Sequence, residues 1–248
     1  AEDTKLDRNV AIKFLPRHIA SNSEERSRFE VEAKAAAALN HPNIATIHAI
    51  EEVDDEIFIV MEYIDGEELQ EKLKSKKLEV RNVINIAQQI ANGLRAAHDK
   101  GIVHRDIKSA NIMINGKGQV KIMDFGLAKV QGGVELTKQQ STLGTAAYMS
   151  PEQSTGGDID HRTDIWSLGV VLYEMLSGKV PFKGDYEQAI IYSILNDDPP
   201  LDVLQDERMC AIIKTCLQKD KANRYNSIND LLNDLQTDRQ TLTDNNRS

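Results

Sequence analysis

Residues 102–114 read IVHRDIKSANIMI, and residues 123–126 read MDFG. In the first stretch, Asp106 is followed by Lys108 two positions later and by Asn111 five positions later. An Asp-Phe-Gly sequence alone is commonly just a turn. Its occurrence at a fixed distance from the first stretch is far rarer than either motif by itself, so the two stretches are interpreted together.

Together these motifs resemble the catalytic signature of protein kinases. The resemblance runs from Val10 to about Leu235. It is to bacterial members of the eukaryotic-like serine/threonine protein kinase family, and the segments that resemble them are VAIKFLP, FEVEAKAAAALNHPNI, FIVMEYIDGEEL and YMSPEQ. It implies an α+β, two-lobed fold with a small, truncated, β-rich N-lobe that includes one helix, and a larger, mainly helical C-lobe. It also implies transfer of the γ-phosphoryl group of ATP to serine or threonine hydroxyls of proteins.

The residue types fit that reaction, because phosphoryl transfer needs positioned groups and neutralised charge rather than covalent chemistry by the protein. In the roles that the family assigns, Asp106 orients the attacking hydroxyl or accepts its proton, and Lys108 stabilises the charge of the transferring phosphoryl group. Asn111 and Asp124 supply oxygen ligands to Mg²⁺, with Mn²⁺ as an alternative. A lysine at position 108 accompanies serine/threonine specificity in the family.

A second basic residue, Lys13, ends the apolar stretch Val-Ala-Ile-Lys. The resemblance implies that it contacts the α- and β-phosphates of ATP, and its long side chain needs a carboxylate to hold it in place. Glu32 lies nineteen residues further on, at the position that matches the pairing glutamate of the family. Glu30 is the alternative, because helical phase does not fully separate the two.

The resemblance also implies an adenine pocket. Ala11 and Met113 are expected to lie on either side of the adenine ring, and Met61 is expected at the back of the pocket. Glu62 and Ile64 are expected to offer main-chain groups from the hinge between the lobes. Each of these residues by itself is ordinary core or strand, so the assignment depends on their register with the other motifs.

The segment between Asp124 and Glu152 resembles an activation loop, a type of segment that phosphorylation orders. Arg105 resembles the arginine that receives an activation-loop phosphate in many relatives. The candidate sites of self-phosphorylation are Thr137, Ser141 and Thr142. Thr145 is expected to lie beside Asp106 and Lys108.

Several other polar residues are expected to have structural roles. The resemblance implies that Glu152 forms a buried ion pair with Arg224 and that Asp164 holds the backbone of the catalytic loop. His98 lies near the end of a predicted helix, where a favourable contact with the helix dipole is the expected role.

Local patterns predict the order of the elements. Residues 9–15 and 56–64 are rich in β-branched and aromatic residues, as strands are. Residues 23–40 predict a helix that buries Phe29, Ala33, Ala36 and Ala37 on one face. Further helices are predicted where Val83, Ile86, Ala87, Ile90, Leu94 and Ala97 form one stripe, and at residues 164–176, which are apolar nearly all round. Residues 111–115 and 119–123 predict two strands around a turn at Gly-Lys-Gly.

This order divides the chain into an N-lobe over residues 1–65, a C-lobe over residues 66–236 and a polar tail over residues 237–248. The hinge is expected near residues 62–66. Only nine residues, none of them glycine, precede Val10, whereas a phosphate-covering glycine lies roughly 20 residues before the strand lysine in relatives. A fragment of a longer bacterial kinase is therefore favoured over a genuinely short protein. Weak activity in isolation and an unpaired strand edge along Val10–Phe14 are expected.

Composition limits the other functions. The formal net charge of −9 argues against nucleic acid or an anionic membrane as the main partner. The sequence has neither a signal peptide nor an apolar run long enough to span a membrane, so we expect a cytoplasmic chain whose parent protein could be anchored elsewhere. A non-catalytic kinase-like scaffold is the main alternative function. A small-molecule phosphotransferase is disfavoured, because residues 144–152, GTAAYMSPE, resemble a loop that docks a peptide substrate.

Overall fold

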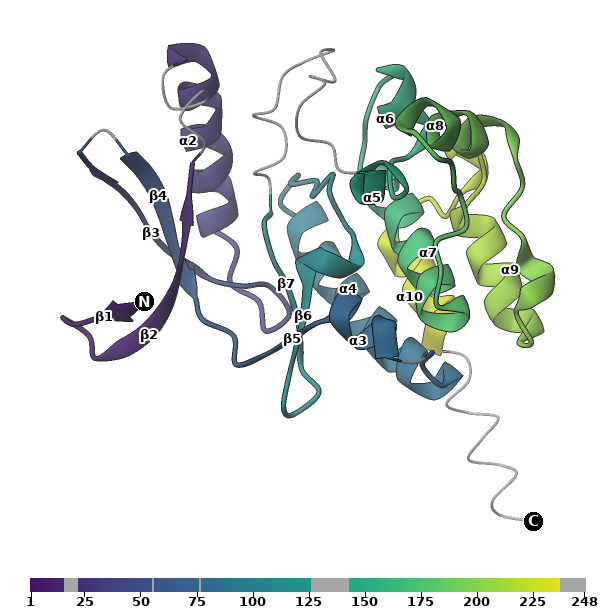
Figure 1. Cartoon of the computed structure of the whole chain (residues 1–248), viewed down its shortest axis with the longest axis horizontal. Helices are drawn as coiled ribbons and strands as arrows, with labels where there is room; N and C mark the ends of the chain where they lie inside the picture. The colour runs from purple at the N-terminus through teal and green to yellow at the C-terminus, as the bar shows by residue number, and fades with distance from the viewer. Residues whose placement is uncertain (16–21, 55, 76, 126–142, 237–248) are drawn as a thin grey trace.

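The computed structural model describes residues 1–15, 22–54, 56–75, 77–125 and 143–236 of the 248-residue chain. A small part with a twisted antiparallel sheet and one long helix lies beside a larger part made mainly of helices (Figure 1). The predicted α+β, two-lobed arrangement is thus confirmed. The predicted boundary between residues 65 and 66 stays a prediction.

The sheet of the small part has the strand order β1-β2-β4-β3 and is antiparallel throughout. Its strands are β1 (Glu2–Asp3), β2 (Arg8–Phe14), β3 (Ile47–Val53) and β4 (Glu56–Glu62). In β4 every second side chain is buried, as expected for a strand with one face on the core. The predictions of β2 and β4 are confirmed, whereas β3 was not predicted.

The free edge of β2 differs in part from the predicted one. Asn9 and Arg8 pair with Glu2 and Asp3, and Val10 exchanges two hydrogen bonds with Ala1. Beyond this point no described strand pairs with the same side of β2. The predicted unpaired edge is therefore wrong for Val10, and for residues 11–14 it stays a prediction.

Helix α2 (Ser23–Ala37) begins where the side chain of Asn22 accepts hydrogen bonds from the backbone N–H groups of Glu24 and Glu25. It buries Phe29 and Ala33 against Ile57, Ile59 and Met61 of β4, whereas the buried Ala36 belongs to the core of the larger part. Ala37, the last residue of the helix, is exposed, contrary to prediction.

The larger part begins with a three-stranded sheet in the order β5-β6-β7. Its strands are β5 (Gly66–Glu68), β6 (Ile112–Asn115) and β7 (Val120–Ile122). At Gly66 a Cβ atom would lie 2.3 Å from the carbonyl oxygen of Ile114, so only glycine allows β5 to approach β6 this closely. The two predicted strands around the Gly-Lys-Gly turn are confirmed.

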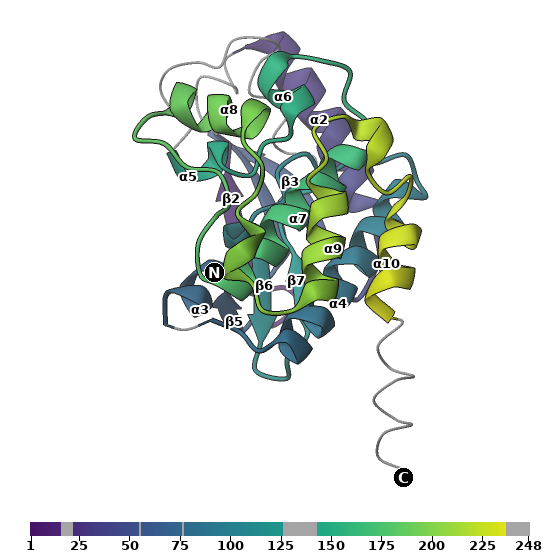
Figure 2. The same ribbon diagram turned by 90° about the vertical axis from the view of Figure 1, so that its right-hand side faces the viewer.

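The helices of the larger part pack around α7 (Arg162–Ser177), which is buried along most of its circumference (Figure 2). Helix α4 (Val80–His98) contacts α7, and every residue of its predicted stripe is buried. The other described helices and 3₁₀ turns are α3 (Leu69–Ser75), η1 (Ser109–Asn111), α5 (Leu143–Ala146), α6 (Pro151–Thr155), α8 (Glu187–Asn196), η2 (Leu201–Val203), α9 (Glu207–Cys216), η3 (Lys221–Asn223) and α10 (Ile228–Gln236). None of the helices in the described ranges is long and apolar enough to cross a bilayer.

The two parts are joined through the segment that follows α2. The backbone N–H of Ile122 donates to the carbonyl of Asn43, and that of Ala45 donates to the carbonyl of Ile122, each at 2.9 Å. The side-chain amide of Asn43 also donates to the carbonyl of Val120 at 2.9 Å. Strand β7 is thereby fixed against the small part, immediately before Asp124.

A buried ion pair joins α6 to the residue that follows η3 in the larger part. Arg224 donates two hydrogen bonds to Glu152, both at 2.7 Å, and its guanidinium lies 5.1 Å from the centre of the Trp166 ring. Burial alone would raise the pKa of the Glu152 carboxyl, but the contact with Arg224 outweighs it and the pKa is lowered. The predicted Glu152–Arg224 pair is confirmed.

We expect Arg224→Ala to reduce the free energy of unfolding by about 3–5 kcal/mol, because it leaves a buried carboxylate without its partner. The control is Arg28→Ala, which removes an exposed pair with Glu24 and should cost less than about 0.5 kcal/mol. Denaturant unfolding at neutral pH measures both. Because the folded-state pKa of Glu152 is lowered, the contribution of the pair is present above the ordinary glutamate pKa and is lost as pH falls. Equal costs for the two variants would contradict this assignment.

Candidate active site

The catalytic loop is the segment that carries the motif from His104 to Asn111. The carboxylate of Asp164, in the first turn of α7, anchors this loop. Asp164 is fully buried, and its two oxygens accept hydrogen bonds from the backbone N–H groups of His104 and Arg105, both at 2.8 Å. Arg105 has a φ of 68°, which is uncommon for a residue other than glycine. Such a conformation persists where its surroundings hold it, and the predicted role of Asp164 is therefore confirmed.

His98 is the third partner of Asp164, with its Nε2 atom 2.8 Å from Oδ2. His98 is the last residue of α4, as predicted, and its role at the helix dipole stays a prediction. The contact of its ring with the buried carboxylate was missed. Burial by itself would raise the pKa of the Asp164 carboxyl, but the contacts with His98 and His104 outweigh it and the pKa is lowered. Asp164 thus remains an acceptor for the loop.

The loop brings together the three polar side chains that its sequence motif predicts. Lys108 Nζ lies 2.9 Å from Asp106 Oδ2. The Asn111 amide donates to the same Oδ2 atom at 2.9 Å and to the Asp106 carbonyl at 2.8 Å. Lys108 also donates to Thr145 Oγ1 at 3.3 Å, so the predicted neighbourhood of Thr145 and Lys108 is confirmed.

Asp124 lies beside this loop, two residues after the end of β7. The backbone N–H of Met123 donates to the carbonyl of Asn111 at 2.8 Å, which fixes the two segments side by side. Asp124 has a φ of 59°. Phe125 turns the other way and packs edge-on against the His104 ring, with 4.5 Å between the ring centres.

The carboxylate that Lys13 meets is different from the predicted one. Lys13 Nζ lies 2.7 Å from Asp124 Oδ2, whereas the sequence predicts a pair with Glu32. The left-handed backbone at Asp124 turns its carboxylate toward β2, while Glu32 lies partly buried on α2. The alternative partner, Glu30, contacts Arg26 and Lys34 on its own helix.

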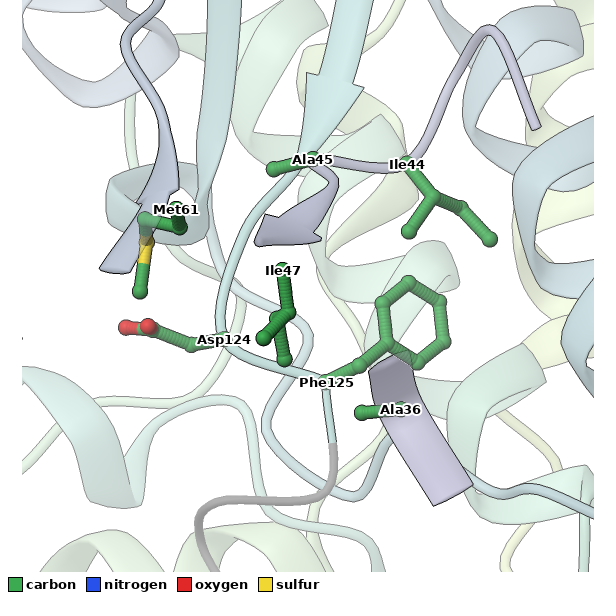
Figure 3. A pocket seen from close by; sticks show the side chains of 7 residues that line it. All are labelled: Ala36, Ile44, Ala45, Ile47, Met61, Asp124 and Phe125. Atoms are coloured by element: carbon green, nitrogen blue, oxygen red, sulfur yellow. The ribbon is translucent and has the colours of Figure 1, made fainter. Parts of the chain in front are cut away.

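A narrow, mainly apolar pocket lies between the small part and the start of the Asp-Phe-Gly motif. It is lined by Ala36, Ile44, Ala45, Ile47, Met61, Asp124 and Phe125 (Figure 3). Met61, expected at the back of the adenine pocket, is buried there. Ala11 lies opposite Met61 in the register of β2 and β4, and Met113 lies on β6.

At the hinge, Glu62 has a second role that sequence reasoning missed. Its carboxylate lies 2.8 Å from Lys121 Nζ on β7 and accepts a hydrogen bond from the Thr46 backbone at 3.1 Å. The backbone N–H of Glu62 donates to the Thr46 carbonyl at 2.8 Å. The sequence predicts that main-chain groups of Glu62 meet adenine. Its backbone N–H, however, already donates its hydrogen bond within the protein.

Sequence reasoning also missed a buried polar cluster of Ser109, Tyr148 and Glu174 beside the catalytic loop. No motif spacing signals it, because its members come from three separate elements. The candidate phosphorylation sites Thr137, Ser141 and Thr142 lie outside the described residues.

The fold and the site agree with comparisons to known proteins. The model of the protein kinase domain family matches residues 1–235, so the chain belongs to this family. Use of ATP and a divalent metal ion is general in the family.

The chain is 38% identical to the serine/threonine-protein kinase PrkC of Bacillus subtilis over 96% of its own length. It is 37% identical to the serine/threonine-protein kinase PknB of Mycobacterium tuberculosis over 95% of its length. The chain spans only 37% and 39% of these two relatives. The crystal structure of the PknI kinase domain of Mycobacterium tuberculosis is similar, with a TM-score of 0.73, 26% identity, and coverage of 91% of this chain and 84% of that one.

We expect Asp164→Asn to destabilise the protein by about 2–4 kcal/mol, because an amide offers one acceptor to buried N–H groups that now meet two oxygens. The control is Asp185→Asn, at an exposed carboxylate. Chemical denaturation measures both free energies of unfolding. A cost at Asp164 no larger than that at Asp185 would contradict the role of Asp164 as the anchor of the loop.

Proposed function

We propose that the chain is the catalytic domain of a serine/threonine protein kinase, which transfers the γ-phosphoryl group of ATP to serine or threonine hydroxyls of proteins. The observation that carries this proposal is the convergence of Asp106, Lys108 and Asn111 at 2.9 Å spacings, next to Asp124. In-line transfer of a phosphoryl group between two oxygens requires a carboxylate, a positively charged side chain and an amide that lie close together.

Asp106 has the role of orienting the acceptor hydroxyl and taking its proton. Its side chain is 24% exposed, so a hydroxyl can reach it from solvent. Lys108, which holds the same carboxylate in this structure, is placed to stabilise negative charge on the phosphoryl group as it transfers.

Asn111 and Asp124 are the residues that would hold Mg²⁺, with Mn²⁺ as the alternative. Their donors are hard oxygens, which Mg²⁺ prefers. The Asn111 amide nitrogen already donates to Asp106, so the side-chain oxygen is the atom left for a cation. When bound, the ion would neutralise negative charge on the phosphate oxygens. Among the described residues no group of three His, Cys, Asp or Glu side chains could hold a metal alone, in keeping with an ion that takes other ligands from the nucleotide and water.

Lys13 is the residue proposed to bind the α- and β-phosphates. In this structure its charge is matched by Asp124, and Glu32 is the proposed partner once phosphates and metal occupy the site. The proposed adenine-binding residues are Ala11, Met61, Glu62, Ile64 and Met113. Their support is the shared register of β2 and β4 and the position of Met61 in the pocket.

The proposed partner is a protein that presents a serine or threonine hydroxyl. The chain's own Thr137, Ser141 and Thr142 are proposed acceptors in self-phosphorylation. A non-catalytic scaffold is not favoured, because the relatives with the same domain are named protein kinases and the polar groups needed for transfer converge in this structure.

We expect Asp106→Asn to lower the rate of phosphoryl transfer from ATP to a generic basic protein by about 100-fold or more, since it removes the proton acceptor. Asp202→Asn, at an exposed carboxylate in η2, should keep the wild-type rate. Radiolabel transferred from γ-labelled ATP is the measurement. Equal labelling by the wild type and Asp106→Asn would refute the proposal.

A further inference from the structure

Three hydroxyl and carboxyl groups meet in the interior beside the catalytic loop. Ser109 Oγ lies 2.9 Å from Tyr148 Oη and 3.2 Å from Glu174 Oε1, and Tyr148 Oη lies 2.7 Å from Glu174 Oε2. Their residues are 0%, 5% and 9% exposed. The three come from η1, from the segment after α5 and from α7, so the cluster joins elements that are distant in the sequence.

A count of hydrogen atoms shows which ionisation state completes this cluster. Three contacts among three groups need three hydrogens, and Ser109 and Tyr148 bring one each. An ionised Glu174 brings none, so one contact would join two lone pairs. A neutral Glu174 supplies the third hydrogen, and each group then donates once and accepts once around a closed ring.

The surroundings favour the neutral carboxyl. Burial raises the pKa of Glu174, and the hydroxyls of Tyr148 and Ser109 offset only part of that effect. Burial and the neighbouring Glu174 also raise the pKa of Tyr148, which keeps its phenol protonated. Within the described part of the chain, no lysine, arginine or histidine forms an ion pair with Glu174.

The ring is connected to the catalytic groups at two points. Ser109 directly follows Lys108 in the chain. Tyr148 donates its backbone N–H to the carbonyl of Thr145 at 3.2 Å, and Thr145 accepts from Lys108 Nζ at 3.3 Å. Lys108, Thr145, Tyr148 and Ser109 thus form a closed circuit, and Ser167 on α7 holds the Tyr148 carbonyl at 2.9 Å.

We propose that Ser109 and Tyr148 are positioning residues, and that their closed ring with a neutral Glu174 fixes the segment at Thr145 against Lys108 on the side where the protein substrate presents its hydroxyl. This inference rests on the proposed kinase function. Lys13 and Asp124 lie outside the circuit. Loss of the ring therefore affects the binding of the protein substrate and leaves the binding of ATP unchanged.

Steady-state kinetics with one serine peptide test this role. Ser109→Ala and Tyr148→Phe should each raise the KM for the peptide by about 3- to 10-fold, as expected for loss of a buried hydrogen bond, with the KM for ATP within about twofold of wild type. The matched control is Tyr225→Phe, which loses another tyrosine–carboxylate bond of 2.7 Å, to Asp234, and should change neither KM. Equal effects on both KM values, or no effect on the peptide KM, would overturn the positioning role.

Glu174→Gln tests the ionisation state, because an amide can donate to Ser109 and accept from Tyr148 as a neutral carboxyl does. We expect its peptide KM to stay within about twofold of wild type, whereas Glu174→Ala should raise it as Ser109→Ala does. A rise in Glu174→Gln as large as in Glu174→Ala would overturn the neutral ring.

A second readout does not need activity, so it separates this inference from the proposed function. The unfolded chain releases the Glu174 proton near the ordinary value of 4.5, while the folded protein retains it to higher pH. The folded state then binds more protons, and stability falls as pH rises above the ordinary value. The denaturation midpoint of the wild type, relative to Glu174→Gln, should therefore decline as pH rises above the ordinary glutamate pKa. A constant or rising difference would overturn the neutral ring, even for a chain that transfers no phosphate.

Discussion

The hydrogen bonds from the catalytic loop to the Asp164 carboxylate are the constraint on which the site depends. They hold His104 and Arg105, and the left-handed backbone of Arg105 would be costly without them. Asp164 lies at the start of α7, which is buried along most of its circumference. The position of Asp106 is therefore set by the centre of the larger part rather than by a surface loop.

Two connections extend this constraint to the rest of the molecule. The Asn111 carbonyl receives the N–H of Met123, which places the end of β7, and hence Asp124, beside the loop. Lys13, on the sheet of the small part, then meets Asp124 at 2.7 Å. The charged groups proposed to handle phosphate thus come from both parts of the fold, and their spacing depends on how the parts pack together.

The sequence predicted the elements that depend on local periodicity, and it missed contacts that depend on packing. The predictions of the buried stripe of α4 and of the apolar helix α7 are confirmed, because burial leaves a regular pattern of apolar residues in the sequence. Strand β3 was missed because its glutamates and half-buried residues do not alternate. The contact between Lys13 and Asp124 was missed, since spacing does not encode the backbone turn at Asp124. The ring at Ser109 joins three elements that no motif brings together.

The measurement that tests the central claim most directly is the identity of the amino acid that receives phosphate. The protein is incubated with γ-labelled ATP, Mg²⁺ and two peptides that differ only in carrying serine or tyrosine at one position, and the labelled residue is identified after hydrolysis. The account predicts label on serine and none on tyrosine. Label on tyrosine alone, or on neither peptide, would contradict it.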